Sequence, residues 1–132
     1  MSKWLNGMQP CGALLMRLSL GGIMAYHGYG KVVPHGALNH YGHFIMTLGL
    51  PYWLGYVSAY TEFVGGMLLV LGLLTRFAAF AITINMLVAL FKVTLHHGYS
   101  GSEYVIALIA IAVMLLCYGA GALALDRKIG FA

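Results

Sequence analysis

The chain has 132 residues, of which 61% are apolar and 8% are charged, against about 45–50% and about 25% in soluble domains. This composition excludes a water-soluble globule, and 18 glycines are typical of lipid-embedded helices packed closely together. The net charge of +4 comes from 7 basic and 3 acidic residues that are scattered along the chain. They form no basic stripe that could neutralise a phosphate backbone, so a nucleic acid is not expected as a partner.

Four segments are apolar over about 20 residues, the length needed to cross a hydrocarbon layer of about 30 Å. They lie at residues 12–33, 52–74, 77–95 and 104–125. None of them shows the alternation of a transmembrane strand. The sequence therefore predicts an all-α integral membrane protein, in which a four-transmembrane-helix bundle forms a single membrane domain over residues 1–132.

The loop at residues 34–51, between the first two spans, has a pattern of its own. Leu38, Tyr41, Ile45 and Leu48 recur there at helical spacing, while polar residues take the other faces. This pattern predicts a short helix that lies at the membrane interface with its apolar side towards the lipid.

Basic residues near the ends of the spans predict the orientation of the chain. The side that holds both termini carries most of them: Lys3, Arg76, Arg127 and Lys128. The opposite side carries Lys31 and Lys92, each at the end of a span. We therefore expect a multi-pass protein of the cytoplasmic (inner) membrane, with both termini in the cytoplasm and the long first loop outside.

Ionisable side chains within the spans are candidates for function, because hydrocarbon penalises them by several kcal/mol unless they find partners. Glu62 lies about 15 Å below the outer end of its span, so it is either protonated or paired with a cation. Polar residues of the other spans fall in the same outer half, and His27 and Lys31 share a face at i, i+4. The full set of expected ligand-binding residues is His27, Lys31, Glu62, Asn85, Lys92, His96 and Glu103. We expect these residues to surround a polar cavity that opens outward above Glu62.

Structural roles for the same residues stay open at this point. Lys31 and Lys92 could extend their ammonium groups to the interface, His27 could be a hydrogen-bonded packing residue, and Glu62 could form a structural ion pair. The six histidines include no recognisable metal-binding signature, so no metal site is expected.

A second group of charges lies on the side of the termini. Asp126 stands beside Arg127 and across from Arg76, with Arg17 on the first span. These four residues are expected to form structural ion pairs that clamp this side of the bundle.

Four segments together resemble the DoxX family of small four-helix membrane proteins. They are RLSLGGIMAYHGYGK (17–31), GLP (49–51), EFVGGMLLVLGLLTR (62–76) and GAGALALD (119–126). The recurring polar positions of the family fall on Arg17, His27, Lys31, Glu62 and Arg76. The serine that the family usually carries before its Leu-Asp pair is Ala124 here, which leaves the role of Asp126 open.

The resemblance implies a function in membrane redox chemistry. One branch of the family, DoxD, forms the membrane subunit of a thiosulfate:quinone oxidoreductase, and other members resemble accessory subunits of redox complexes. We therefore expect an accessory subunit of a quinone-linked oxidoreductase complex, with a quinone as the possible ligand, no cofactor bound by this chain alone, and other subunits as partners besides the lipid bilayer. Whether the chain itself takes part in catalysis stays open. The alternatives are a non-enzymatic scaffold subunit and a small transporter or metal handler.

Overall fold

The computed structural model describes residues 1–131, which form helices and connecting turns with no β-strand. The elements are α1 (Ser2–Gly7), α2 (Gln9–Val32), α3 (Ala37–Thr47), α4 (Tyr52–Leu71), α5 (Thr75–Lys92), η1 (Thr94–His97), α6 (Tyr99–Tyr118) and α7 (Leu125–Ile129). The predicted all-helical class is confirmed, and the short helix expected in the first loop is α3.

Three helical segments of the described chain are long and apolar enough to cross a membrane: Tyr52–Leu71, Thr75–His97 and Tyr99–Tyr118. Helix α2 is not among them, although its 24 residues exceed the required length. Its sequence includes Arg17, His27 and Lys31, which lower its apolarity. The chain is therefore an all-α membrane protein in which hydropathy establishes three spans.

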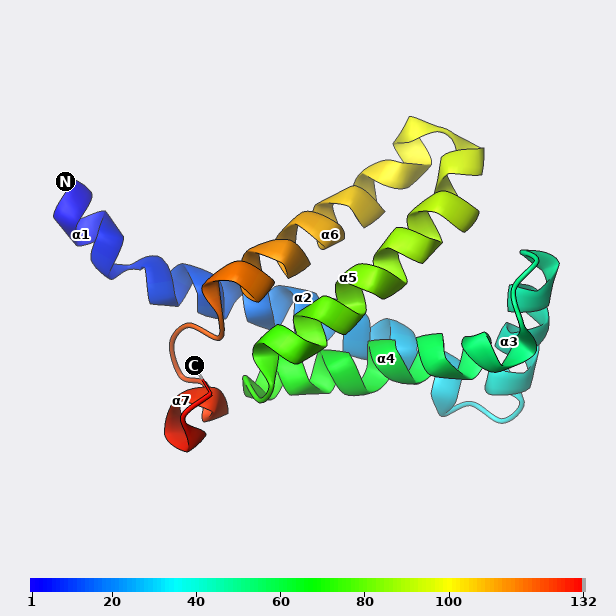
Figure 1. Ribbon diagram of the computed structural model, residues 1–132, viewed down its shortest axis with the longest axis horizontal. Coiled ribbons are helices and arrows are strands. Elements are labelled where there is room, and N and C mark those ends of the chain that lie inside the picture. The colour runs from blue at the N-terminus through cyan, green and yellow to red at the C-terminus, as the bar shows by residue number, and fades with distance from the viewer. Residues whose placement is uncertain (132) are drawn as a thin grey trace.

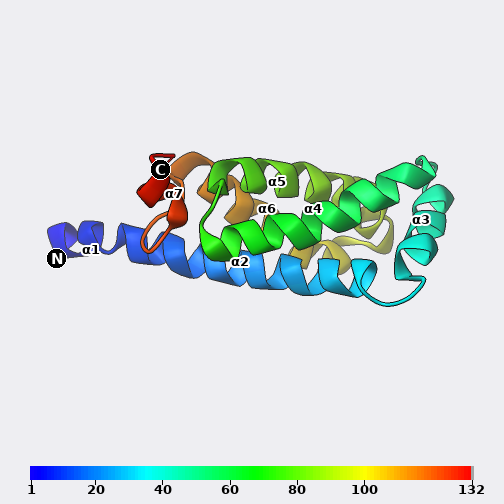
Figure 2. The same cartoon turned by 90° about the horizontal axis from the view of Figure 1, so that it is seen from below.

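The long helices form two antiparallel pairs, α2 with α4 and α5 with α6 (Figure 1). The pairs meet where both termini and the α4–α5 turn lie, and Figure 1 shows them diverging towards the end that holds α3 and η1. The view in Figure 2 shows α3 covering the far end of α2 and α4. We call the end with the termini the closed end and the end with α3 the open end.

Small residues hold α2 against α4. A Cβ atom on Gly28 would overlap the backbone of Phe63, one on Gly66 would overlap the backbone of Ala25, and one on Gly21 would lie 2.8 Å from the carbonyl oxygen of Gly66. Backbones can approach this closely only where side chains are absent. The packing role predicted for these glycines is confirmed, and it fixes the position of α2 beside the carboxylate-bearing face of α4.

The apolar core lies where the two helix pairs meet. Its buried members are Leu20, Met24, Leu69, Ala78, Ala79, Ile82, Met86, Val105, Leu108, Ala112 and Leu115. They come from α2, α4, α5 and α6, so all four long helices bury one face against the others. Large apolar side chains remain exposed on the outer faces, as Phe77 does at 77%, which fits a lipid environment.

The last long helix occupies a different range from the span expected at residues 104–125. It begins at Tyr99, directly after Gly98 reverses the chain at φ +90°, and it ends at Tyr118. Gly119 and Gly121 adopt φ values of +102° and +74°, which a continuing right-handed helix does not allow. Residues 119–124 therefore form a turn across the closed end rather than a continuation of the helix.

Candidate functional site

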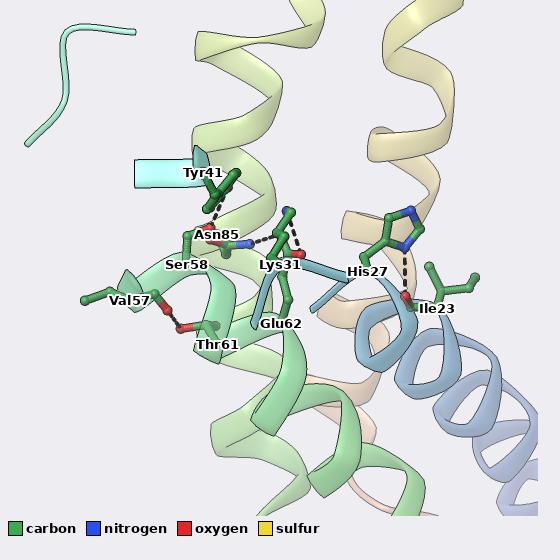
Figure 3. Close-up of polar contacts among 9 residues, drawn as sticks. All are labelled: Ile23, His27, Lys31, Tyr41, Val57, Ser58, Thr61, Glu62 and Asn85. Atoms are coloured by element: carbon green, nitrogen blue, oxygen red, sulfur yellow. Dashed lines mark hydrogen bonds and ion pairs between the residues drawn. The ribbon is translucent and has the colours of Figure 1, made fainter. Parts of the chain in front are cut away.

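Glu62 lies at the centre of a polar cluster near the middle of α4, and its side chain is buried (Figure 3). Lys31 of α2 donates hydrogen bonds from Nζ to both carboxylate oxygens, at 2.9 and 2.8 Å. Asn85 of α5 donates from Nδ2 to Glu62 Oε1 at 3.0 Å. Three helices thus converge on one carboxylate, and Lys31 forms a salt bridge with it.

A chain of hydroxyl and amide groups extends from this carboxylate. Ser58 donates from Oγ to Asn85 Oδ1 at 2.6 Å, and the Tyr41 hydroxyl lies 3.1 Å from Ser58 Oγ. Because the Ser58 proton is used towards Asn85, Tyr41 is the donor in the second bond. Every hydrogen bond between Tyr41 and Glu62 therefore has its donor on the Tyr41 side and its acceptor on the Glu62 side.

Lys31 is held from a second direction by Tyr41. Its ammonium lies 4.4 Å from the centroid of the Tyr41 ring, within the range of a cation–π contact. The Lys31 side chain keeps 28% of its surface exposed, against 5% for Glu62. The Lys31 ammonium thus contacts a buried carboxylate and an aromatic face, and its side chain is partly exposed to an open space beside them.

That space is a cavity of ≈ 640 Å³ at the open end, between α3, α4 and α5. We call it the polar cavity, and its polar lining is Lys31, His40, Tyr41, Ser58, Thr61, Glu62, Asn85, Lys92 and Thr94. The rest of its wall is apolar. Lys31 and Glu62 pair with each other, so among the lysine, arginine and acidic side chains of the cavity lining Lys92 is left as an additional positive charge. A cavity of this kind suits a mainly apolar ligand with an electron-rich oxygen.

The structure brings together four of the expected ligand-binding residues, namely Lys31, Glu62, Asn85 and Lys92. Tyr41 and Ser58 join them and were missed by the sequence analysis. Ser58 precedes Glu62 by four residues and therefore shares its helix face, which is a signal that could have identified it. The sequence analysis assigned Tyr41 only to the apolar side of the interfacial helix. No pattern within α3 predicts that its hydroxyl reaches Ser58 on α4.

His27 lies outside the polar cavity, contrary to prediction. Its Nδ1–H donates to the carbonyl oxygen of Ile23 at 2.8 Å, and its ring centroid lies 6.4 Å from that of Tyr104 on α6. Figure 3 shows the ring directed away from Glu62. The i, i+4 relation to Lys31 holds, but the long Lys31 side chain bends towards α4 while the short imidazole stays on the side of α6.

His96 and Glu103 also lie outside the polar cavity, and both are exposed. His96 belongs to η1, where α5 has already ended, so its direction no longer follows the face of Lys92. Glu103 lies one turn inside α6, on a helix that contributes no residue to the cavity wall. The expectation that all four long helices line one cavity is wrong for α6.

At the closed end, hydrogen bonds to the backbone replace the expected ion pairs. Arg17 is buried and donates to the carbonyl oxygens of Ala120 and Leu123, at 2.6 and 3.0 Å. Among residues 1–131 the structure forms one salt bridge, that of Lys31 with Glu62. The ion pairs predicted for Arg17, Arg76, Asp126 and Arg127 are therefore corrected: Arg76 makes a long 3.4 Å contact to the carbonyl oxygen of Tyr118, and Arg127 is exposed.

Asp126 does clamp the closed end, but through amide groups. Its Oδ1 accepts from the backbone N–H of Leu74 at 2.6 Å, and its Oδ2 from that of Thr75 at 2.8 Å. These donors lie at the start of α5, where N–H groups lack helical partners and the helix dipole favours a negative charge. The carboxylate thereby caps α5 and stabilises Leu74 in a left-handed conformation at φ +50°.

Comparison with known proteins agrees with the resemblance of the sequence segments. The sequence model of the DoxX family matches residues 12–97, which include three of the four segments but not residues 119–126. A Bacillus subtilis (strain 168) protein named "Putative oxidoreductase CatD" is 32% identical over 124 residues, covering 92% of this chain and 90% of that protein. No solved structure matches the chain significantly. With the family match over most of its length and this relative along nearly all of it, the chain belongs to the DoxX family.

Proposed function

We propose that this protein binds the oxygen-bearing head group of a quinone in the polar cavity and serves as a membrane accessory subunit of a respiratory or redox complex. The observation that carries the proposal is the Lys31–Glu62 pair in the wall of a ≈ 640 Å³ cavity that also holds an unpaired cation, Lys92. Ligand pockets usually measure about 300–1,000 Å³ and combine an apolar wall with a few directed polar groups. The lining therefore suits an aromatic ring with oxygen substituents.

In this proposal the lysines and the carboxylate of the cavity have different roles. Lys92 and the remaining N–H of Lys31 donate to the ligand oxygens, where negative charge develops on reduction. Glu62 orients Lys31 and is the one carboxylate in the cavity lining that can take up or release a proton. His27 has no part in this arrangement, because its ring lies on the other side of α2.

The electron donor is placed in another subunit, as in a thiosulfate:quinone oxidoreductase. The name of the Bacillus subtilis relative supports an oxidoreductase role in general terms. The position of the polar cavity leaves the outer faces of α5 and α6 available for such a subunit and for lipid.

We further propose that α2 is the fourth span and that the closed end faces the cytoplasm of the inner membrane. Helix α2 runs along α4 in both views, so the two cross the same layer (Figures 1 and 2). The closed end contains both termini and the α4–α5 turn with Arg76, together with Arg127 and Lys128 of α7. This excess of basic residues supports the orientation.

Quinone binding is tested by titrating the detergent-purified protein with a benzoquinone that carries a decyl tail, with protection against thermal unfolding as the readout. We expect saturable protection, and a roughly tenfold weaker affinity in Lys92→Met, because a hydrogen bond from a charged group contributes about 1.5 kcal/mol or more. Lys128→Met, at the exposed α7, serves as the control and should leave the affinity unchanged. Absence of saturable protection, or a Lys92→Met variant that binds like wild type, would overturn the proposal.

A second function, that of a scaffold subunit, is favoured by one specific observation. The carboxylate of Glu62 already accepts three hydrogen bonds from protein groups, so the network is complete without a ligand. In a scaffold, Glu62→Gln would lower the unfolding temperature by the same amount with and without quinone. In a quinone-binding protein, the same substitution would also diminish the stabilisation that the quinone provides.

A further inference from the structure

A second hollow of ≈ 420 Å³ adjoins the polar cavity in the groove between α4 and α5. Its lining is Val57, Tyr60, Thr61, Val64, Gly65, Leu68, Leu74, Phe77, Ala78 and Ala81. We call it the apolar groove. Three of these residues, Val57, Thr61 and Ala81, also line the polar cavity, so the two spaces adjoin at these residues, which we call the junction.

The polar side chains in the lining of the apolar groove are those of Tyr60 and Thr61. The hydroxyl of Thr61, at the junction, donates to the carbonyl oxygen of Val57 at 2.7 Å (Figure 3). The floor is made of small residues, Gly65 on α4 and Ala78 on α5, and exposed Tyr60 and Phe77 stand beside them as walls. The other eight residues of the lining are apolar, so the groove suits a hydrocarbon chain.

The groove leads from the junction towards the closed end. Along α4 it extends from Val57 to Leu68, about 16 Å at the helical rise of 1.5 Å per residue. Along α5 it extends from Ala81 back to Leu74. A head group in the polar cavity would therefore direct any attached chain down the groove, parallel to the helices.

We infer that the ligand of the polar cavity is a membrane amphiphile, an oxygen-bearing ring with one long hydrocarbon tail that occupies the apolar groove. This inference rests on the proposed quinone function and specifies its substrate class, a lipid-tailed quinone rather than a soluble one or a small anion. Lipid tails are as apolar as the groove, so the tail gains little free energy by entering it. The groove instead admits a ligand whose tail must remain in hydrocarbon while its head meets Lys31 and Lys92.

The test compares two probes with the same benzoquinone head, one with a decyl tail and one without a tail. Val64 lines the apolar groove but not the polar cavity, and its side chain is 47% exposed, so Val64→Phe should obstruct the groove without changing the wall of the head-group site. We expect this variant to bind the decyl compound at least tenfold more weakly than wild type does and the tail-less compound within about twofold of wild type. Ala107→Phe, on an exposed part of α6 outside both hollows, is the matched control and should change neither affinity.

Equal losses for both compounds in Val64→Phe, or no loss for the decyl compound, would overturn the inference while leaving quinone binding intact. Failure of wild type to bind either compound would instead overturn the proposed function itself.

A second measurement on wild type covers the case in which Val64→Phe does not fold. A quinone with a photoreactive diazirine at the tail end should crosslink to the groove, near Leu68, Leu74 or Phe77. Crosslinks confined to the outer face of α6 would contradict the placement of the tail.

Discussion

The two ends of the bundle bury charged side chains, Arg17 and Asp126 at the closed end and Glu62 at the open end, and they pair them in different ways. At the closed end, Arg17 donates to two carbonyl oxygens of the turn at residues 119–124. At the open end, Glu62 accepts from two side chains, Lys31 and Asn85, beside a cavity. Backbone groups cannot turn away without unfolding the turn, whereas side chains can exchange partners. The comparison indicates that the closed end is structural and that the open end is able to respond to a ligand.

The largest effect on stability is expected for Arg17→Met. The substitution leaves two backbone carbonyl groups without their donor, that of Ala120 buried and that of Leu123 partly buried, at about 1–3 kcal/mol for a buried group and less for the other. We expect the free energy of unfolding to fall by roughly 3 kcal/mol, measured by thermal or denaturant unfolding in detergent, and the segment after Tyr118 to become sensitive to protease. Arg17→Lys should recover part of the loss, because one ammonium cannot reproduce the two-armed contact. If Arg17→Met had wild-type stability, the conclusion that the closed end has a structural role would be wrong.

Glu62→Gln should lower the free energy of unfolding by about 2 kcal/mol. Removing one partner of a buried pair costs about 3–5 kcal/mol, but Lys31 is 28% exposed and can turn to water, which reduces the loss. The effect is measured by unfolding without ligand, alone and combined with Lys31→Met. The double variant should lose less than the sum of the single losses, and strict additivity would show that the ion pair contributes nothing.

Asp126→Asn should cost about 1 kcal/mol. One amide oxygen replaces two carboxylate oxygens, so one of the bonds from Leu74 and Thr75 is lost, together with the interaction of the charge with the α5 dipole. Thermal unfolding is the readout, and Arg127→Gln is the control. Equal destabilisation by Arg127→Gln would instead indicate that Asp126 and Arg127 form an ion pair, as the sequence analysis expected.

The smallest effect is expected for His27→Gln. His27 lies on the α6 side of α2, so its replacement should leave the affinity for the decyl quinone within about twofold of wild type. Lys92→Met, by contrast, should weaken that affinity about tenfold. A loss in His27→Gln as large as in Lys92→Met would place the head group between α2 and α6 instead of in the polar cavity.

Much of the open end could be predicted from the sequence because depth along a helix follows from residue number. The count of residues from the end of its span placed Glu62 within the hydrocarbon layer, and this depth required a cation or a proton. The same count could not exclude His27 or His96 from the polar cavity. It gives the depth of a residue and the approximate helix face on which it lies, but not the direction in which its side chain bends. Tyr41 was missed for a related reason: α3 is placed by its contact with α4, where a Cβ on Gly55 would lie 2.8 Å from the Cα of Gly42.

By itself the sequence determined that the chain is helical and membrane-embedded, that its glycines allow close packing, and that a carboxylate lies at depth in need of a partner. These properties follow from composition and from the rise of 1.5 Å per residue. The tertiary structure alone decided which groups became partners: Lys31 rather than His27 for Glu62, backbone amides rather than arginines for Asp126, and carbonyl groups for Arg17. Such pairings depend on how helices distant in sequence cross and diverge, and no local pattern encodes that.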